Sequence, residues 1–211
     1  MHQLTRPSSP GCLRRYRYGR NTWCDVSPDE KTEIWRSLDL MQGYRCAYCE
    51  ASLKMKSGQP EGHIEHFRQR KHHPQGTFDW QNLFGSCNRQ ESCGKHKDRQ
   101  CYDHLDLIKM DEEDPEAYLR FLPEGSVEPA DHLTPEAHRR ATETIRVFNL
   151  NGPLREIRAN HLIGYRQTAE ELLAFAAEFE ESEWRALLEE ELRAIKGQPF
   201  ETAIRHVLQV P

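Results

Sequence analysis

Gly62-His63-Ile64-Glu65-His66-Phe67-Arg68 lies between two pairs of cysteines, and this arrangement decides the fold. Cys46-Ala47-Tyr48-Cys49 precedes the stretch, and Cys87 and Cys93 follow it. Four cysteine sulfurs form a closed tetrahedral zinc site, and zinc binding contributes folding energy to a small module that has little core of its own. The spacing therefore predicts one structural Zn²⁺ on the two pairs, with His96 as an alternative to Cys93.

The composition favours a folded cytoplasmic protein. The chain has 211 residues, of which 36 % are hydrophobic and 30 % charged, so it can bury one core or one catalytic module with a helical annex. No run approaches the roughly 18 apolar residues of a membrane span, and the first residues lack the apolar segment of a signal peptide. In a reducing compartment, close cysteine pairs hold metal more often than they form disulfides. We therefore expect a cytoplasmic location and no membrane partner.

Charge is distributed unevenly along the chain. The net charge of −5 by itself disfavours a nucleic-acid partner. Residues 1–25 are nevertheless basic, whereas residues 170–191 are rich in glutamate. A basic front and an acidic back suit a protein that touches phosphate on one side only.

Capping and turn signals predict the elements around the cysteine-rich segment. Ser27-Pro28-Asp29-Glu30 has the serine cap, the first-turn proline and the glutamate of a helix start, and Gly43 ends that helix. Residues 118–128 predict a small hairpin. Amphipathic helices are expected from Thr134 to the end of the chain, because apolar residues recur there at helical spacing.

An acidic linker at residues 111–114 divides the chain into two expected regions. Residues 1–110 contain an N-terminal arm, a helix and the segment that is rich in cysteine and histidine. Residues 111–211 are expected to be mainly helical.

Glu65, His66 and Asn82 supply the side chains that phosphodiester hydrolysis requires. The reaction needs an activated water, a cation on the developing charge and a group that holds the base in register. His66 can deprotonate water near neutral pH, and Glu65 can bind Mg²⁺ or Mn²⁺ through oxygen. Asn82 is expected to fix the imidazole by hydrogen bonding. These three residues are the predicted catalytic set.

The same residues, in this order, resemble the HNH nuclease superfamily. Its pattern is an acid-His pair, an Asn-Leu dipeptide and flanking cysteine pairs that end in Cys-x-x-x-Lys. Glu65-His66, Asn82-Leu83 and the run from Cys93 to Lys97 match that pattern. The sequence is similar in particular to the PtuB-like branch of Septu and retron antiphage systems. That similarity is carried by residues 64–68, 78–87, 93–98, 108–115 and 144–151, so the resemblance covers residues 44–151 and extends weakly into the helices that follow.

One position departs from the family pattern. The superfamily's third metal-binding residue follows the last cysteine directly, and here that place is taken by Gly94, which has no side chain. The missing ligand must come from His63, His96 or Asp98, or from water. His63 is favoured, because it lies two residues before Glu65 and alternate strand residues share a face.

Basic residues follow the acid-His pair. Arg68, Arg70 and Lys71 would place positive charge beside the scissile phosphate, and Lys97 joins them in the predicted nucleic-acid-binding set. A solvated surface loop is the alternative interpretation.

The resemblance implies an α+β fold, in which a small zinc-stapled ββα-metal core is wrapped by helices. It also implies a metal-dependent endonuclease that attacks DNA, or else tRNA, as the effector of an antiphage system with a PtuA-type ATPase. The acidic helices of residues 111–211 are then the candidate docking region for that partner. Two alternatives stay open: a zinc-bound nucleic-acid-binding module without catalysis, and a stand-alone restriction or homing nuclease.

Overall fold

The computed structural model describes residues 1–53, 55–56 and 59–209, and these residues form a mixed helix-and-sheet structure. The helices are α1 (Pro28–Gln42), α2 (Cys93–Lys97), α3 (Pro135–Phe148), α4 (Pro153–His161), α5 (Ile163–Glu178), α6 (Glu181–Ala194) and α7 (Glu201–Leu208). The strands are β1 (Met55–Lys56), β2 (Gln59–Pro60), β3 (Gly62–His66), β4 (Leu83–Cys87), β5 (Leu119–Phe121) and β6 (Val127–Pro129). Consecutive strands pair in antiparallel fashion, as β1–β2, β3–β4 and β5–β6.

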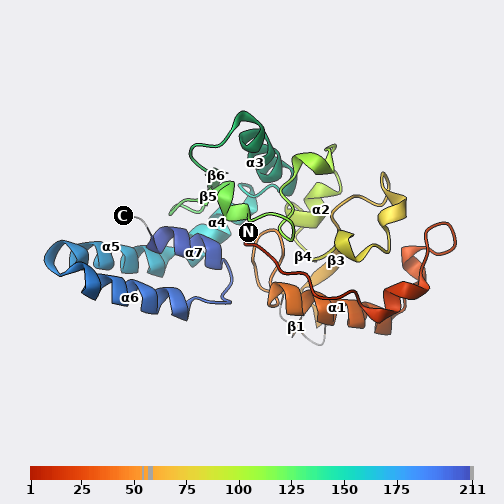
Figure 1. Cartoon of the computed structure of the whole chain (residues 1–211), viewed down its shortest axis with the longest axis horizontal. Helices are drawn as coiled ribbons and strands as arrows, with labels where there is room; N and C mark the ends of the chain where they lie inside the picture. The colour runs from red at the N-terminus through yellow and green to blue at the C-terminus, as the bar shows by residue number, and fades with distance from the viewer. Residues whose placement is uncertain (54, 57–58, 210–211) are drawn as a thin grey trace.

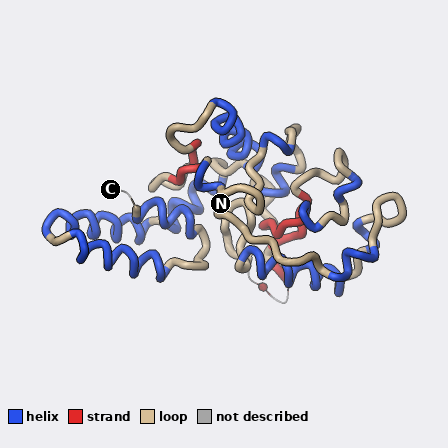
Figure 2. The backbone as a smooth tube through the Cα atoms, in the orientation of Figure 1, coloured by secondary structure: helices blue, strands red, loops and turns tan. Residues whose placement is uncertain are grey.

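The molecule is elongated (Figures 1 and 2). The α5–α6 hairpin projects at one end beside α7, whereas α1, α2 and the β3–β4 pair lie toward the other end. None of the helices that the described residues form combines the length and the apolar character needed to cross a bilayer.

The predicted first helix is confirmed, and so is its start. The Ser27 hydroxyl accepts a hydrogen bond from Glu30 N, and the Glu30 carboxylate accepts one from Ser27 N. This reciprocal capping box satisfies two backbone donors that the first helical turn cannot pair internally. Gly43 ends α1 in the left-handed region, with φ 58°, which suits glycine because no Cβ clashes there.

Helix α1 packs against β4 through one buried amide side chain. Gln42 is 2 % exposed, and its Nε2 donates to Gly85 O at 2.9 Å while its Oε1 accepts from Gly85 N at 2.7 Å. A Cβ on Gly85 would lie 2.9 Å from the Trp35 ring, so the approach of the helix requires glycine at this position. The β3–β4 pair, on which the candidate site is built, is thereby fixed to α1.

The predicted hairpin of residues 118–128 is confirmed as β5–β6, and α3 packs against it. The expected acidic linker does not behave as one. The side chain of Asp111 is buried, and its carboxylate lies 2.6 Å from Arg6 Nε and 3.1 Å from Lys109 Nζ. Burial of an aspartate is tolerable only with such partners, and the partner from the N-terminal arm could not be read from the local sequence.

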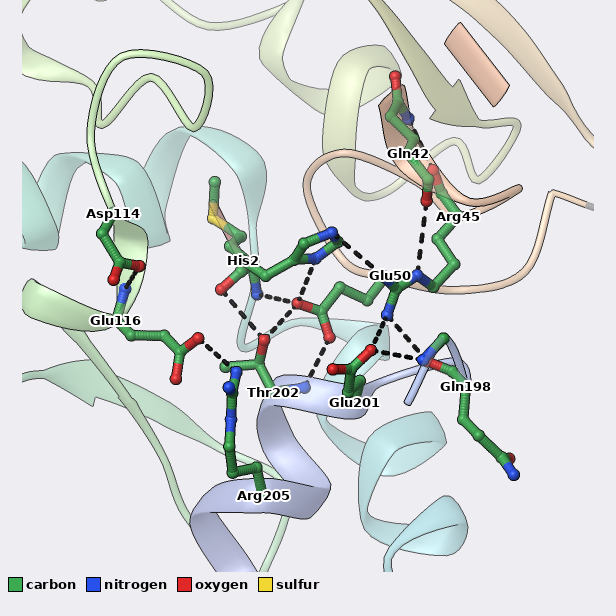
Figure 3. A network of polar contacts seen from close by, with 12 residues as sticks. His2, Gln42, Arg45, Glu50, Asp114, Glu116, Gln198, Glu201, Thr202 and Arg205 are labelled. Atoms are coloured by element: carbon green, nitrogen blue, oxygen red, sulfur yellow. Dashed lines mark hydrogen bonds and ion pairs between the residues drawn. The ribbon is translucent and has the colours of Figure 1, made fainter. Parts of the chain in front are cut away.

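A polar network joins α7 to the segment that carries the first cysteine pair (Figure 3). Glu50, which follows Cys49 directly, is 1 % exposed and accepts hydrogen bonds from Thr202 N at 3.0 Å and Thr202 Oγ1 at 2.5 Å. Beside it, Arg45 Nη1 lies 2.8 Å from Glu201 Oε2. The C-terminal helix is thus anchored next to a predicted zinc ligand, 152 residues away in sequence.

Candidate metal and catalytic site

The two cysteine pairs meet as the sequence predicts. The sulfurs of Cys46, Cys49, Cys87 and Cys93 all lie within 4.8 Å of one another, and all four residues are buried. The sulfurs of Cys49 and Cys87 are 3.9 Å apart, and Cys87 N donates to the sulfur of Cys46 at 3.4 Å. Within the described parts of the chain, no other set of three or more His, Cys, Asp or Glu side chains converges in this way. The cluster could hold a metal such as zinc.

The electrostatics of the cluster favour a cation at its centre. Burial opposes ionisation of Cys46, but hydrogen bonds from the other three thiols outweigh it and lower the pKa of Cys46 well below its ordinary value. Burial and the neighbouring sulfurs raise the pKa of Cys93 well above its ordinary value. Protein atoms alone thus favour the thiolate at Cys46 and oppose it at Cys93, whereas Zn²⁺ binds cysteine as the thiolate. His96 is not needed as the fourth ligand, because Cys93 completes the cluster, and the Nδ1 of His96 contacts Val147 O on α3 at 2.9 Å.

His66 is held as a neutral base. Its Nε2 lies 3.0 Å from Thr77 O, and because a carbonyl only accepts, Nε2 carries the proton and Nδ1 keeps the lone pair. The residue is 6 % exposed, and the Trp23 ring meets the imidazole edge-on, with the ring centroids 4.7 Å apart. Burial lowers the pKa of His66 to about 4, and the positive charges of Arg70 and Lys97 add to this effect.

Asn82 contacts the loop after β3 and not the imidazole. It is fully buried; its Oδ1 accepts from Arg68 N at 2.7 Å, and its Nδ2 donates to Arg68 O at 3.1 Å and Gly76 O at 3.0 Å. The hydrogen bond that we expected from Asn82 to His66 is made by Thr77 O instead. Asn82 holds Gly76, and the residue after Gly76 is Thr77, whose carbonyl contacts the imidazole. Asn82 can therefore position His66 only through the backbone of this loop.

Glu65 is buried on the opposite face of β3 from His66, since neighbouring residues in a strand point to opposite faces. It is 2 % exposed, and its Oε2 accepts a hydrogen bond from the Tyr48 hydroxyl. Its Oε1 lies 2.6 Å from Lys97 Nζ. Both oxygens of the predicted metal ligand are therefore engaged by protein groups.

Lys97 was predicted on the nucleic-acid-binding surface, but its side chain is fully buried. Four oxygens surround its ammonium: Glu65 Oε1 at 2.6 Å, His66 O at 2.8 Å, Asp98 Oδ1 at 2.8 Å and Tyr102 OH at 3.3 Å. We call this arrangement the oxygen cage. Burial alone would lower the pKa of Lys97, but Glu65, Tyr102 and Asp98 raise it above its ordinary value, so the ammonium stays charged.

Gly94 lies against Glu65 and against His63, the residue favoured to replace its missing ligand. A Cβ at this position would lie 2.3 Å from Glu65 Cγ and 3.1 Å from His63 Nε2, so the space that a side chain would fill is already taken. His63 Nδ1 contacts Asn88 Oδ1 at 3.2 Å, while its Nε2 is buried and has no hydrogen-bond partner among the described residues. An orphaned ring nitrogen of this kind fits a metal ligand, and His63 and Glu65 as ligands of a divalent ion stay a prediction.

The predicted basic loop lines an open pocket of about 450 Å³. Arg70, Lys71 and His72 contribute from the loop, and Asp98 and Arg99 from the end of α2. Arg68 is directed elsewhere, because its Nη2 lies 2.6 Å from Asp79 Oδ2. The half-exposed Asp98 thus belongs both to the oxygen cage and to the lining of this pocket, whose rim carries positive charge.

Three contributors to this arrangement were missed by sequence reasoning. Thr77 acts through its backbone carbonyl and leaves no signal in the sequence. Tyr102 lies outside the motif. Tyr48 is different, because it lies between Cys46 and Cys49. The predicted cysteine cluster brings this segment close to the segment that carries Glu65, so a contact between the two could have been anticipated.

These features define a mixed helix-and-sheet protein with a four-cysteine cluster that could hold a metal such as zinc. No protein-family model matches the chain. The chain is similar to the Septu protein PtuB of Bacillus thuringiensis, with 25 % identity over 190 residues, which are 85 % of this chain and 66 % of that protein. It therefore spans slightly less than two thirds of that relative's length. The predicted resemblance to PtuB-like proteins is confirmed by this similarity.

Proposed function

We propose that the chain is an HNH-type endonuclease that hydrolyses phosphodiester bonds of nucleic acid as the effector of a Septu-type antiphage system. The similarity to a Septu protein supports the biological setting. The observation that carries the chemistry is the neutral imidazole of His66, which is buried and fixed by Thr77 O. Arg70, which lines the basic pocket, helps to keep the imidazole neutral by lowering the pKa of His66. In this proposal β3, β4 and α2 form the ββα-metal core, and the cysteine cluster with Zn²⁺ fastens its two ends.

His66 acts as the general base in this proposal. Its Nδ1 accepts a proton from the attacking water, and Thr77 O stabilises the imidazolium that forms, as an oriented acceptor does for other catalytic histidines. Asn82 is a positioning residue that holds the loop carrying Thr77. Glu65 and His63 are the proposed ligands of a divalent ion. Bound Mg²⁺ or Mn²⁺ would neutralise charge on the phosphate and on the leaving oxygen.

DNA is the favoured substrate of the proposed enzyme, and tRNA is the second candidate. Arg70 and Lys71 at the rim of the pocket would bind phosphate, and Arg68 could join them only by leaving Asp79. A cytoplasmic location is part of the same proposal, since both substrates are found there.

Cleavage assays on both nucleic acids test this function. Zinc-loaded protein with Mg²⁺ or Mn²⁺ should nick supercoiled plasmid or cut tRNA, and His66→Ala should lower the rate by about a hundredfold or more. His138→Ala, which changes an exposed histidine on α3, is the matched control and should cleave normally. Equal activity of the His66→Ala variant would reject His66 as the base. If the wild-type protein binds nucleic acid but cuts neither substrate, with or without an ATPase partner, the nuclease is rejected and a binding module without catalysis is supported.

The proposed partner is a PtuA-type ATPase that docks on the helices of residues 111–211. This is supported by the similarity to Septu PtuB and by apolar side chains that are exposed on α5, α6 and the turn between them, Leu173, Phe179 and Leu187. Charged substitutions such as Leu173→Glu should abolish co-purification with the ATPase and leave cleavage of plasmid by the isolated chain unchanged. Full activity without any partner would favour a stand-alone restriction or homing nuclease.

A further inference from the structure

The oxygen cage around Lys97 is built as a cation site. Three of its oxygens, Glu65 Oε1, His66 O and Asp98 Oδ1, lie 2.6 to 2.8 Å from one nitrogen. Two carboxylates and a backbone carbonyl are also the ligands that Mg²⁺ and Mn²⁺ prefer. The ammonium therefore lies where oxygens of this type would otherwise hold a metal ion.

The charges of the cage are not balanced by its present occupant. Lys97 contributes one positive charge, whereas Glu65 and Asp98 together contribute two negative charges. A divalent ion would neutralise both carboxylates, whereas Lys97 compensates the buried Glu65 and leaves the excess negative charge at the half-exposed Asp98.

The cage has an opening toward solvent. Glu65 is buried, but the Asp98 side chain is 56 % exposed and lines the basic pocket of about 450 Å³. The same pocket is lined by Arg70, Lys71 and Arg99. An ion could enter past Asp98, and the long side chain of Lys97 could turn outward into a space that is already shaped for anionic groups.

We propose that Lys97 is an exchangeable occupant of the catalytic cation site: a divalent ion binds Glu65, Asp98 and the carbonyl of His66, and the displaced Lys97 ammonium joins the phosphate-binding residues of the pocket. The role of the ion in cleavage rests on the proposed nuclease function, but the exchange itself does not. It gives a role to the lysine of the Cys-x-x-x-Lys pattern, which is buried against Glu65. It also adds Asp98 and the carbonyl of His66 to the ligands Glu65 and His63 of the proposed function, in place of a side chain at Gly94.

Amine labelling of the wild-type, zinc-loaded chain tests the exchange without any nucleic acid. The protein is treated briefly with acetic anhydride, with and without saturating Mn²⁺, and modified lysines are identified by peptide mass spectrometry. Lys97 should be protected without Mn²⁺ and should react at least tenfold faster with it. Exposed Lys71 is the internal control, and NaCl at matched ionic strength is the control for screening. A Lys97 that stays protected at saturating Mn²⁺ overturns the proposal.

Binding of Mn²⁺, measured by electron paramagnetic resonance of the free ion, gives a second and independent readout. Asp98→Asn, which changes a half-exposed side chain, should weaken Mn²⁺ binding at least tenfold. Lys97→Met should strengthen it at least tenfold, because the competing cation is gone, and Lys95→Met on the same helix should leave it unchanged. Unaltered affinity in Asp98→Asn would contradict the proposed ligand set, even if Lys97→Met failed to fold.

The outcomes separate this inference from the proposed nuclease. If Mn²⁺ exposes Lys97 but no nucleic acid is cut, the cation site stands and the nuclease is rejected. If Mn²⁺ supports cleavage while Lys97 stays protected, the nuclease stands and the exchange is rejected.

Discussion

The sulfur cluster and the oxygen cage, the two proposed cation sites, share one short helix and differ in how they are closed. Cys93 is the first residue of α2 and Lys97 the last. Residues four apart on a helix lie on the same side, so α2 supplies one group to each site. The cluster consists of four sulfurs and has no open position, which is typical of structural zinc. The cage is closed by a lysine on one side and opens at Asp98 on another, which suits a site that changes its occupant.

The largest expected effect comes from breaking the sulfur site. Cys49→Ser should abolish zinc binding and unfold the region around β3 and β4, because structural zinc contributes about 10–16 kcal/mol of apparent binding energy in small zinc modules. Elemental analysis and circular dichroism check this, with Cys24→Ser, an exposed cysteine, as the control. A Cys49→Ser variant that folds and retains one zinc would contradict the assignment.

Breaking the oxygen cage should cost less. Lys97→Met leaves Glu65 buried without its cation, which typically destabilises a protein by about 3–5 kcal/mol. Arg185→Ala on α6 removes an exposed pair with Glu181 and should change stability by about 0.5 kcal/mol or less. Urea unfolding of zinc-loaded protein without added divalent ion measures both. Equal effects of the two substitutions would show that buried Glu65 does not depend on the charge of Lys97.

A substitution in the loop that connects β3 to β4 should have an intermediate effect on stability. Asn82→Ala removes the partners of three backbone groups and should destabilise the chain by about 2–3 kcal/mol. It should also lower the cleavage rate, and combining it with His66→Ala should add little further loss, because residues that act as one unit are not additive. Gln75→Ala, exposed on the same loop, is the control. Losses that multiply would show that Asn82 acts independently of His66.

The smallest expected effect on stability comes from Asp39, a carboxylate that forms no ion pair among the described residues. Partial burial raises the pKa of Asp39 from 3.8 to about 6. The folded chain therefore holds this proton more tightly than the unfolded chain, and the associated stability is present below pH 4 and lost as the pH rises to about 6. Asp39→Asn should stabilise the chain by about 1 kcal/mol at pH 7, after solvent screening is allowed for, and by nothing at pH 4. Thermal unfolding at the two pH values measures this, and a pH-independent difference would contradict it.

Local signals predicted much of this architecture correctly. The Ser27 capping box, the end of α1 at Gly43 and the hairpin of residues 118–128 depend on neighbours in the sequence, and all three are confirmed. The cysteine cluster is a longer-range prediction that also succeeded, because two-residue spacing already points a pair of sulfurs at one place. Arg6 as a partner of Asp111 and Glu65 as a partner of Lys97 were not predictable, since each comes from a segment distant in the chain.

The sequence by itself determined which side chains meet where chemistry depends on spacing: four cysteines in one cluster, and His63 and Glu65 on one face of a strand beside Gly94. Only the tertiary structure decided what each of these groups contacts. Packing of the loop gave His66 the carbonyl of Thr77 in place of Asn82, and packing of α2 placed Lys97 against Glu65. The physical reason is that a buried polar group must find a partner wherever the fold supplies one, and that partner is set by three-dimensional proximity and not by sequence separation.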